Sequence, residues 1–428
     1  MAQSAMKLGK EKIQVSVPDE GLLGTLESRP IPGAGSEEEV IRRALENPVN
    51  SPKLRDLVRS GESVCIVICD ITRVWQRPHV YLPLLLKELE RAGVKDEDIT
   101  FLSGTGTHRD QTSEEHQALL GDLSSRFSVV DNHCEDRSSL VHVGVTSLGT
   151  PVEINKRALE SDHVVITGAV VYHFMAGWGG GRKAILPGIA GRETVMKNHS
   201  LALLPSPGTG RNMNCRSGNL EGNLIHQDMM EAAAMVAPSF ALNVVIGSGT
   251  GTIDAALAGD WKEAHLEATQ IVDQADGVPI TEKADVVIAS AGGYPKDINF
   301  YQVSKTIMNG YEAVKHGGAL IILGECSEGY GNGEVQFMLQ DFHTQEEREA
   351  ELRREFTIAK YVGYFVGQVA RDTDFYLVSR MDPKELEGTG IIPIQSLEQA
   401  MEMISAKGRG PTIWLMPTGA SVLPKISG

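Results

Sequence analysis

Short apolar runs that alternate with helical patterns constrain the fold of this 428-residue chain more than any other feature. One series contains VCIVIC (64–69), ITFLS (99–103), VVITG (164–168) and ALNVVIG (241–247); a second contains ADVVIAS (284–290), ALIILG (319–324), FYLVS (375–379) and PTIWLM (411–416). These runs are predominantly apolar, which is typical of parallel strands that are buried on both faces. The pattern predicts an α/β protein made of two α/β domains with largely parallel sheets.

A charged, amphipathic helical stretch at residues 260–276 separates the two series and is a candidate hinge. We therefore expect an N-terminal α/β domain over residues 1–276 and a C-terminal α/β domain over residues 277–428. We also expect the last ~15 residues to return to the N-terminal domain, because chain termini often lie close together.

Charge and cysteine content exclude several classes of protein. The formal net charge is −16 and no basic stripe is present, which argues against nucleic-acid binding. No run approaches the ~18 apolar residues of a membrane span, so we expect no membrane partner. The five cysteines are scattered without the spacing of a zinc site or a disulfide framework. A cytoplasmic location is therefore expected.

Polar side chains follow several predicted strands directly, and ligands bind beyond the carboxyl ends of such strands in open parallel sheets. Each of these residues also has a structural interpretation, such as capping a turn or lying on a solvated helix face. If all of these residues were structural, polar side chains would have gathered at four equivalent strand ends by coincidence. We therefore favour a functional site. Its candidate residues are Asp70, Thr72, Arg73, His108, His173, Tyr301, Gln302 and Lys305.

A glycine triplet, Gly179–Gly181, follows one of these strands and leads to Arg182, Lys183 and a predicted helix that ends near His199. Successive glycines cost conformational entropy on folding, which suggests a special backbone conformation. The stretch does not fit the phosphate-binding pattern GxxxxGK[ST], and GxGxxG and HExxH are absent as well. A kinase or a nicotinamide-dependent dehydrogenase is therefore disfavoured.

Five segments together resemble the nickel-dependent lactate racemase family. They are DITR (70–73), GTGTH (104–108), HFMAGWGGGRKAILPG (173–188), NH (198–199) and GGYPKDINFYQVSK (292–305). The resemblance covers nearly the whole chain in order. It implies two α/β domains with an active-site cleft between them, the N-terminal one carrying the cofactor and acid/base residues and the C-terminal one contributing substrate-binding residues.

The resemblance also implies a cofactor, the nickel-pincer nucleotide (pyridinium-3-thioamide-5-thiocarboxylic acid mononucleotide nickel), which separate cofactor biosynthesis proteins would supply. Lys183 would carry it covalently and His199 would be the protein ligand to nickel. Asp70, Thr72, Gly180 and Gly181 are expected around the cofactor, with Asp70 also orienting a catalytic histidine. His108 and His173 would be the acid/base pair, and the substrate would be bound by Arg73, Tyr301, Gln302 and Lys305.

The residue types suit the racemisation or epimerisation of a 2-hydroxy acid by proton-coupled hydride transfer through a 2-keto acid. Each enantiomer needs its own base, and imidazole titrates in the required range. Arginine can bind the substrate carboxylate through two hydrogen bonds. Met175 is expected to line the pocket and to admit substrates other than lactate, such as a longer aliphatic acid, an aromatic acid, malate or a sugar acid. The alternative is a non-catalytic carrier or sensor that binds a nickel nucleotide or a small anion.

Overall fold

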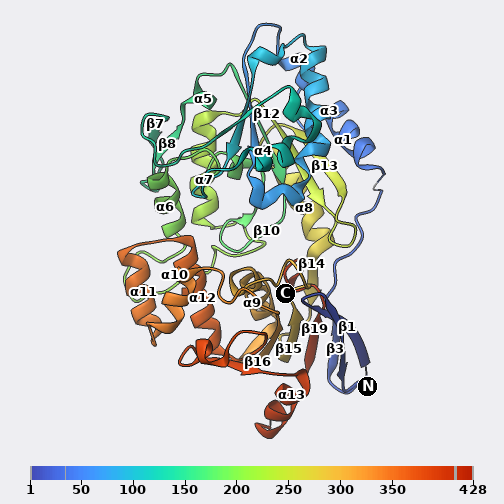
Figure 1. The fold of residues 1–428 in the computed structure, drawn as a ribbon, viewed down its shortest axis with the longest axis vertical. Coiled ribbons are helices and arrows are strands. Elements are labelled where there is room, and N and C mark those ends of the chain that lie inside the picture. Colours follow the sequence, from blue (N-terminus) through green and yellow to red (C-terminus); the bar gives the residue numbers. More distant parts are fainter. Residues whose placement is uncertain (1, 34, 409–411, 427–428) are drawn as a thin grey trace. The chain divides into compact units, whose positions relative to one another are not determined.

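The computed structural model describes residues 2–33, 35–408 and 412–426 of the chain. Its fold divides into two compact units (Figure 1). The unit called central here comprises Pro30–Leu203 and Arg211–Ala275, and the unit called terminal comprises the described residues of Met1–Arg29, Leu204–Gly210 and Asp276–Gly428. The two units are described separately below.

The central unit contains a six-stranded sheet in the order β13-β12-β9-β4-β5-β6. All neighbouring strands are parallel except β12 and β13, which are antiparallel. The predicted parallel strands are therefore confirmed, whereas β13 was missed because its sequence IDAALAG is rich in alanine and poor in β-branched residues. The strands are β4 (Val64–Cys69), β5 (Ile99–Gly104), β6 (Val129–Asp131), β9 (His163–Ala169), β12 (Phe240–Ile246) and β13 (Ile253–Gly259).

Helices cover this sheet and bury its apolar side chains. Alternate residues of β4, Val64, Ile66 and Ile68, pack with apolar residues of α1 and α3, which lie against one another (Figure 1). The helices of the unit are α1 (Glu37–Glu46), α2 (Leu54–Leu57), α3 (Pro78–Arg91), α4 (Ser113–Leu120), α5 (Lys156–Leu159), α6 (Arg192–Ser200), α7 (Leu224–Val236) and α8 (Glu263–Asp276). Two antiparallel pairs complete it: β7 (Leu140–Val145) with β8 (Pro151–Asn155), and β10 (Tyr172–His173) with β11 (Gly177–Trp178).

The terminal unit contains a second six-stranded sheet, all parallel, in the order β18-β17-β16-β15-β19-β3. Its helix α9 packs on β15 and β16, and α12 packs against α9, α10 and α11. The strands are β3 (Leu22–Thr25), β15 (Ala284–Ser290), β16 (Val314–Leu323), β17 (Asp374–Val378), β18 (Ile391–Ile394) and β19 (Ile413–Met416). The helices are α9 (Phe300–Ala313), α10 (Gly333–Gln340), α11 (Gln345–Arg354), α12 (Ile358–Asp372) and α13 (Leu397–Ala406).

The first residues of the chain belong to the terminal unit and not, as the sequence suggested, to the N-terminal domain. The hairpin β1 (Ala2–Leu8)–β2 (Glu11–Val17) packs its apolar residues with this unit's core, and β3 extends its sheet by pairing with β19. The last strand, β20 (Leu423–Ile426), pairs with β14 (Gly277–Ile280) in the same unit and does not return to the other one. Tertiary pairing of sequence-distant strands decides both assignments, and no local pattern reports it.

A short excursion of the chain, Leu204–Gly210, also packs with the terminal unit. The Glu349 carboxylate accepts hydrogen bonds from the backbone N–H groups of Gly208 and Gly210 at 2.8 and 3.0 Å. Arg353 donates to the carbonyl oxygens of Leu204 and Ser206. Among the described residues of the whole chain, no helix is long and apolar enough to cross a membrane.

Candidate active site

Asp70 follows the last residue of β4 and is the centre of a hydrogen-bonded group. Its carboxylate is 1% exposed and accepts hydrogen bonds from Thr72 Oγ1 and Arg73 Nη1, both at 2.8 Å. Its other oxygen pairs with His108 Nδ1. Burial alone would raise the pKa of Asp70, but the bond from His108 and the charge of Arg73 together hold that pKa below its ordinary value. The carboxylate therefore stays ionised and orients both partners.

His108 follows β5 through a turn in which Gly106 has a φ of +60°. Its Nδ1 atom faces the Asp70 carboxylate, which can only accept, so Nδ1 carries the hydrogen and Nε2 keeps its lone pair. The side chain is 44% exposed. His108 is thus an oriented imidazole whose free nitrogen is able to take a proton.

Gln111 links the Asp70 and His108 segments, and no sequence signal marks it beyond its position three residues after His108. Its Oε1 accepts from the Ile71 N–H at 2.6 Å, and its Nε2 donates to Ser103 Oγ and Asp131 Oδ1. Its own N–H donates to Asp131 Oδ2. The side chain therefore ties together the carboxyl ends of β4, β5 and β6.

His173 lies in the β10–β11 hairpin of the central unit, and its two ring nitrogens have different partners. Nδ1 accepts from the N–H groups of Met175 and Ala176 at 3.3 and 3.2 Å, which places the hydrogen on Nε2. Nε2 lies 3.3 Å from Lys183 Nζ. Burial, followed by the charge of Lys183, lowers the pKa of His173 well below its ordinary value. The ring is therefore neutral and presents a donor where His108 presents an acceptor.

The glycine triplet leads into the 3₁₀ turn Gly181–Ala184 that carries Lys183. Gly180 and Gly181 have φ values of +71° and +52°, which favour glycine. A Cβ on Gly180 would lie 2.9 Å from the Ala169 carbonyl oxygen, and one on Gly181 would lie 2.6 Å from the His265 ring. The packing of the protein itself thus requires both glycines. Burial, and then the charges of arginine side chains, lower the pKa of Lys183 well below its ordinary value.

His199 lies near the end of α6 and is 1% exposed. Its Nδ1 donates to the Val195 carbonyl oxygen at 2.8 Å, so Nε2 keeps a lone pair. Burial, and then the charge of Lys183, lower the pKa of His199 to about 3. The preceding residue, Asn198, anchors the helix by donating to Asp228 and to the Ile225 carbonyl oxygen. A neutral imidazole with one fixed free nitrogen is suited to bind a metal.

The central unit therefore brings together all of its predicted site residues. Direct bonds join Asp70 to Thr72, Arg73 and His108, and a direct contact joins His173 to Lys183. The charge of Arg73 contributes to the lowered pKa of both His173 and Lys183, and that of Lys183 to the lowered pKa of His199. These electrostatic effects connect the two bonded groups.

The donor set fits a metal that is held mainly by a bound organic group. Among the described residues, no cluster of three or more histidine, cysteine, aspartate or glutamate side chains is arranged to hold a metal ion. His199 offers a single free nitrogen, and the lowered pKa of the Lys183 amine favours the form that can make a covalent link. A tethered cofactor that brings its own ligands matches this pair, whereas a metal held by protein side chains alone does not.

The three predicted residues of the terminal unit lie on the first turns of α9, which Asn299 caps by accepting from the Gln302 N–H. Lys305 Nζ donates to Gln302 Oε1 at 3.0 Å, so these two side chains share one face of the helix. The Tyr301 N–H donates to the Tyr330 carbonyl oxygen. Their predicted role in substrate binding remains a prediction.

The expectation that Met175 lines the substrate pocket is wrong for this structure. The side chain has no exposed surface, and the Met175 carbonyl oxygen accepts a hydrogen bond from Asn223 Nδ2. The Phe174 ring stacks on His173 instead, with ring centroids 5.0 Å apart and an angle of 14° between the planes. The hairpin turn directs residue 175 into the core, which the linear sequence does not reveal.

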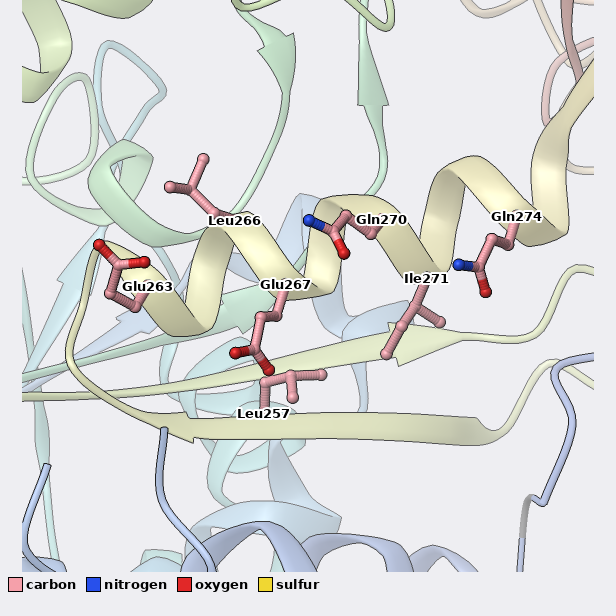
Figure 2. Close-up of a pocket in the computed structure, with 7 residues that line it drawn as sticks. All are labelled: Leu257, Glu263, Leu266, Glu267, Gln270, Ile271 and Gln274. Atoms are coloured by element: carbon pink, nitrogen blue, oxygen red, sulfur yellow. The ribbon is translucent and has the colours of Figure 1, made fainter. Parts of the chain in front are cut away.

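A hollow of about 490 Å³ lies elsewhere on the central unit, beside α8 (Figure 2). Its lining contains the carboxylates of Glu263 and Glu267, the amides of Gln270 and Gln274, and three aliphatic side chains, those of Leu257, Leu266 and Ile271. None of the predicted site residues lines it, and it offers no cation for an anionic substrate. The hollow therefore shares no residue with the predicted site.

Comparisons with known proteins agree with this geometry. Residues 8–210 match the family model described as the lactate racemase N-terminal domain, and residues 280–424 match the lactate racemase C-terminal domain. The chain is 38% identical to a lactate racemase of Thermoanaerobacterium thermosaccharolyticum over 338 residues, which are 77% of this chain and 76% of the relative. It is 32% identical to the lactate racemase of Lactiplantibacillus plantarum over 425 residues, 97% of this chain and 98% of the relative.

Solved structures show the same likeness. The lactate racemase apoprotein from Thermoanaerobacterium thermosaccharolyticum matches with a TM-score of 0.89 and 31% identity, covering 99% of this chain and 100% of that one. A protein from Thermotoga maritima matches with a TM-score of 0.65 at 18% identity, covering 92% of this chain and 100% of that one, which shows a shared fold alone.

Proposed function

This chain belongs to the lactate racemase family and is a racemase, and we propose that it inverts the configuration of a 2-hydroxy acid through a 2-keto acid intermediate. The observation that supports this best is a pair of oriented imidazoles, one bonded to Asp70 and the other in contact with the Lys183 amine. His108 is oriented by Asp70 with a free lone pair, and His173 contacts Lys183 with a hydrogen on the facing nitrogen.

The two histidines divide the proton chemistry. His108 Nε2 takes the hydroxyl proton of one enantiomer, and the ionised Asp70 stabilises the imidazolium that forms. His173 serves the other face, where its Nε2 first donates a hydrogen bond to the substrate oxygen. To act as a base there, the ring has to exchange the hydrogen between its nitrogens, since the N–H groups of Met175 and Ala176 occupy Nδ1 in this structure.

Arg73 is proposed to bind the substrate carboxylate. Its guanidinium is 40% exposed and uses Nη1 for Asp70, which leaves further N–H donors for a second carboxylate. On α9, Lys305 and Gln302, with Tyr301 beside them, are the further substrate-binding residues that the resemblance implies, and we propose that role for them. These groups hold and orient the anion while the two imidazoles exchange its proton.

The cofactor proposed for this site is the nickel-pincer nucleotide, with Lys183 as its covalent attachment and His199 Nε2 as the protein ligand to nickel. When bound, it supplies the hydride acceptor that proton transfer alone cannot provide. Asp70 and Thr72, which are bonded to each other, are proposed to border the cofactor, and Gly180 and Gly181 shape the turn that presents Lys183. Nickel accepts an imidazole nitrogen of the kind that His199 offers.

Lactate is the substrate to test first. A broader substrate range remains a prediction, and the Met175 side chain, on which it partly depended, is buried in this structure. Longer aliphatic acids, aromatic acids, malate and sugar acids remain the panel against which lactate is compared. The assay starts from single enantiomers and follows the appearance of the other by chiral chromatography.

The test uses protein made together with the cofactor biosynthesis proteins. We expect His108→Ala and His173→Ala each to lower the racemisation rate by roughly 10²-fold or more while the mass increase on Lys183 stays. His133→Ala is the control, because it removes an imidazole from an exposed His–Asp pair at the surface. Full activity in both site variants would favour the alternative, a carrier or sensor that needs Lys183 and His199 only.

A further inference from the structure

Arg182 is the largest fully buried side chain of the described chain, with 0% exposure. No carboxylate of the described residues pairs with it, and its partners are carbonyl oxygens and two histidine rings. A buried and unpaired charge costs several kcal/mol of stability. The fold tolerates this cost at the residue directly before Lys183.

The guanidinium holds the hairpin that carries His173. Arg182 Nη2 donates to the Ala176 carbonyl oxygen at 2.7 Å, and Nη1 donates to that of Trp178 at 3.0 Å. Within the hairpin, His173 pairs with Gly177, which lies between these two residues. One rigid side chain thus connects the β10–β11 hairpin to the 3₁₀ turn of Lys183, and it sets where the His173 ring meets the Lys183 amine.

Two further histidines complete the surroundings of Arg182 without adding charge. Arg182 Nε donates to His226 Nδ1 at 3.1 Å, and burial lowers the pKa of His226 to about 3. His265 Nε2 lies 2.8 Å from Arg182 Nη1 and 2.9 Å from the Gly179 carbonyl oxygen. This nitrogen either accepts from the arginine or donates to the carbonyl, and burial lowers the pKa of His265 as well. Among Arg182, His226 and His265, the positive charge is therefore that of Arg182.

We propose that Arg182 is a positioning residue of this racemase: it fixes the Lys183 amine against His173, and its unpaired charge favours the uncharged amine that cofactor attachment requires. The proposal rests on the proposed role of Lys183. Attachment forms a bond between Nζ and the carbonyl or thiocarbonyl carbon of an activated carboxyl or thiocarboxyl donor. The leaving group departs from that carbon with its electron pair, and nitrogen releases a proton. An ammonium has no lone pair with which to start this step.

The charged and titratable groups that face Lys183 support the proposal. Burial is the largest cause of its lowered pKa, and the charges of Arg182 and then Arg73 follow. His173 contacts the amine from the hairpin, and His199 faces it from α6. The Asp70 carboxylate, which could have favoured an ammonium, is already bonded to Arg73 and His108. Of the two arginine charges that act on the amine, that of Arg73 is therefore paired with Asp70, whereas that of Arg182 has no carboxylate partner among the described residues.

The experiment measures how fast Lys183 of the cofactor-free protein is acetylated by a small amine-acylating reagent between pH 5 and 11, read by peptide mass spectrometry. Lys183 is half-buried, so the reagent can reach it. In the wild type we expect a midpoint well below the ordinary lysine value of about 10.4. Arg182→Gln removes the charge and should raise the midpoint by about one pH unit, with roughly tenfold slower labelling below it.

Arg348→Gln is the matched control. Arg348 is also buried and donates to the carbonyl oxygens of Met338 and Phe342, but it lies in the terminal unit. It should lower stability without moving the Lys183 midpoint. If Arg182→Gln does not fold, Arg182→Lys carries the test, because it keeps the charge and should keep the midpoint within about half a pH unit.

A wild-type midpoint near the ordinary lysine value would overturn the proposal, and so would an unchanged midpoint in folded Arg182→Gln, or a midpoint in Arg182→Lys that rises by a full unit. The measurement needs neither cofactor nor substrate. A failure here therefore stays distinct from a failure of the racemase assay, which tests His108 and His173 in the loaded protein.

Discussion

His199 Nδ1 lies 2.8 Å from the carbonyl oxygen of Val195, one turn earlier in α6. This bond fixes the hydrogen on Nδ1 and leaves Nε2 as the only free nitrogen of the ring. Because the donor and the acceptor belong to the same helix, the ring is oriented before any ligand arrives. Such preorganisation is what a metal ligand requires.

We therefore expect His199→Ala to separate nickel binding from cofactor attachment. The variant should lose roughly tenfold or more of its nickel affinity, because the protein's own ligand is gone, while the mass increase on Lys183 remains. Nickel analysis and intact-protein mass spectrometry on the same sample test this. His163→Ala is the control, since that ring bonds Glu62 and Ser239 at the start of β9. Unchanged nickel in His199→Ala would contradict the assignment.

Gln111→Ala should lower kcat by roughly tenfold while KM changes little. The variant loses the acceptor for the Ile71 N–H and the donor to Asp131. The segment that carries Asp70 is then no longer bonded through residue 111 to the end of β6, and the position of Asp70 relative to His108 is less fixed. Steady-state kinetics and the pH dependence of kcat check this, with exposed Gln117→Ala as the control. If Gln111→Ala only lowers the amount of folded protein and leaves kcat per folded molecule unchanged, Gln111 has no positioning role.

Gly180→Ala should destabilise the protein more than Gly33→Ala. Both glycines have similar positive φ values, +71° and +74°, so the backbone cost of about 1–2 kcal/mol is shared. Nothing lies within 4 Å of a Cβ on Gly33, whereas one on Gly180 would meet Val170 and the Ala169 carbonyl oxygen. We expect an additional cost of about 1–3 kcal/mol from that overlap, measured by urea unfolding. Equal losses would show that the turn relaxes freely.

Stability should fall as the pH drops below 6.5, in part because of His226. Its pKa is lowered to about 3 when folded, by burial and then by Arg182, and is near 6.5 when unfolded. Between these values the unfolded chain binds a proton that the folded chain does not, so the free energy of unfolding decreases by at most about 1.4 kcal/mol per pH unit. Above pH 6.5 this contribution is constant and favours the folded state.

Urea unfolding at pH 7, 6 and 5 tests this for the wild type and His226→Gln. The variant should lose less stability per pH unit than the wild type, by up to the same ~1.4 kcal/mol. His265 adds a decrease of the same sign in both proteins, because its pKa is also lowered by burial. Identical slopes would mean that His226 is already exposed to protons in the folded protein.

Some features followed from the sequence alone. The apolar runs within β4, β9, β15 and β16 predicted buried parallel strands, because a strand covered on both faces is rich in apolar side chains. The polar residues at strand ends, Asp70 and His108 among them, are bonded as neighbours on adjacent strands should be. The same motifs also indicated the family.

Only the tertiary structure decided the rest. The pairing of β3 with β19 places the first residues in the terminal unit, and the hairpin turn after His173 buries Met175. Gln111 and Arg182 act through bonds to residues distant in sequence or across a turn, and no local pattern marks such partners. Periodicity reports which face of an element is buried. It does not report which distant group a buried polar side chain meets, because that depends on how the elements pack.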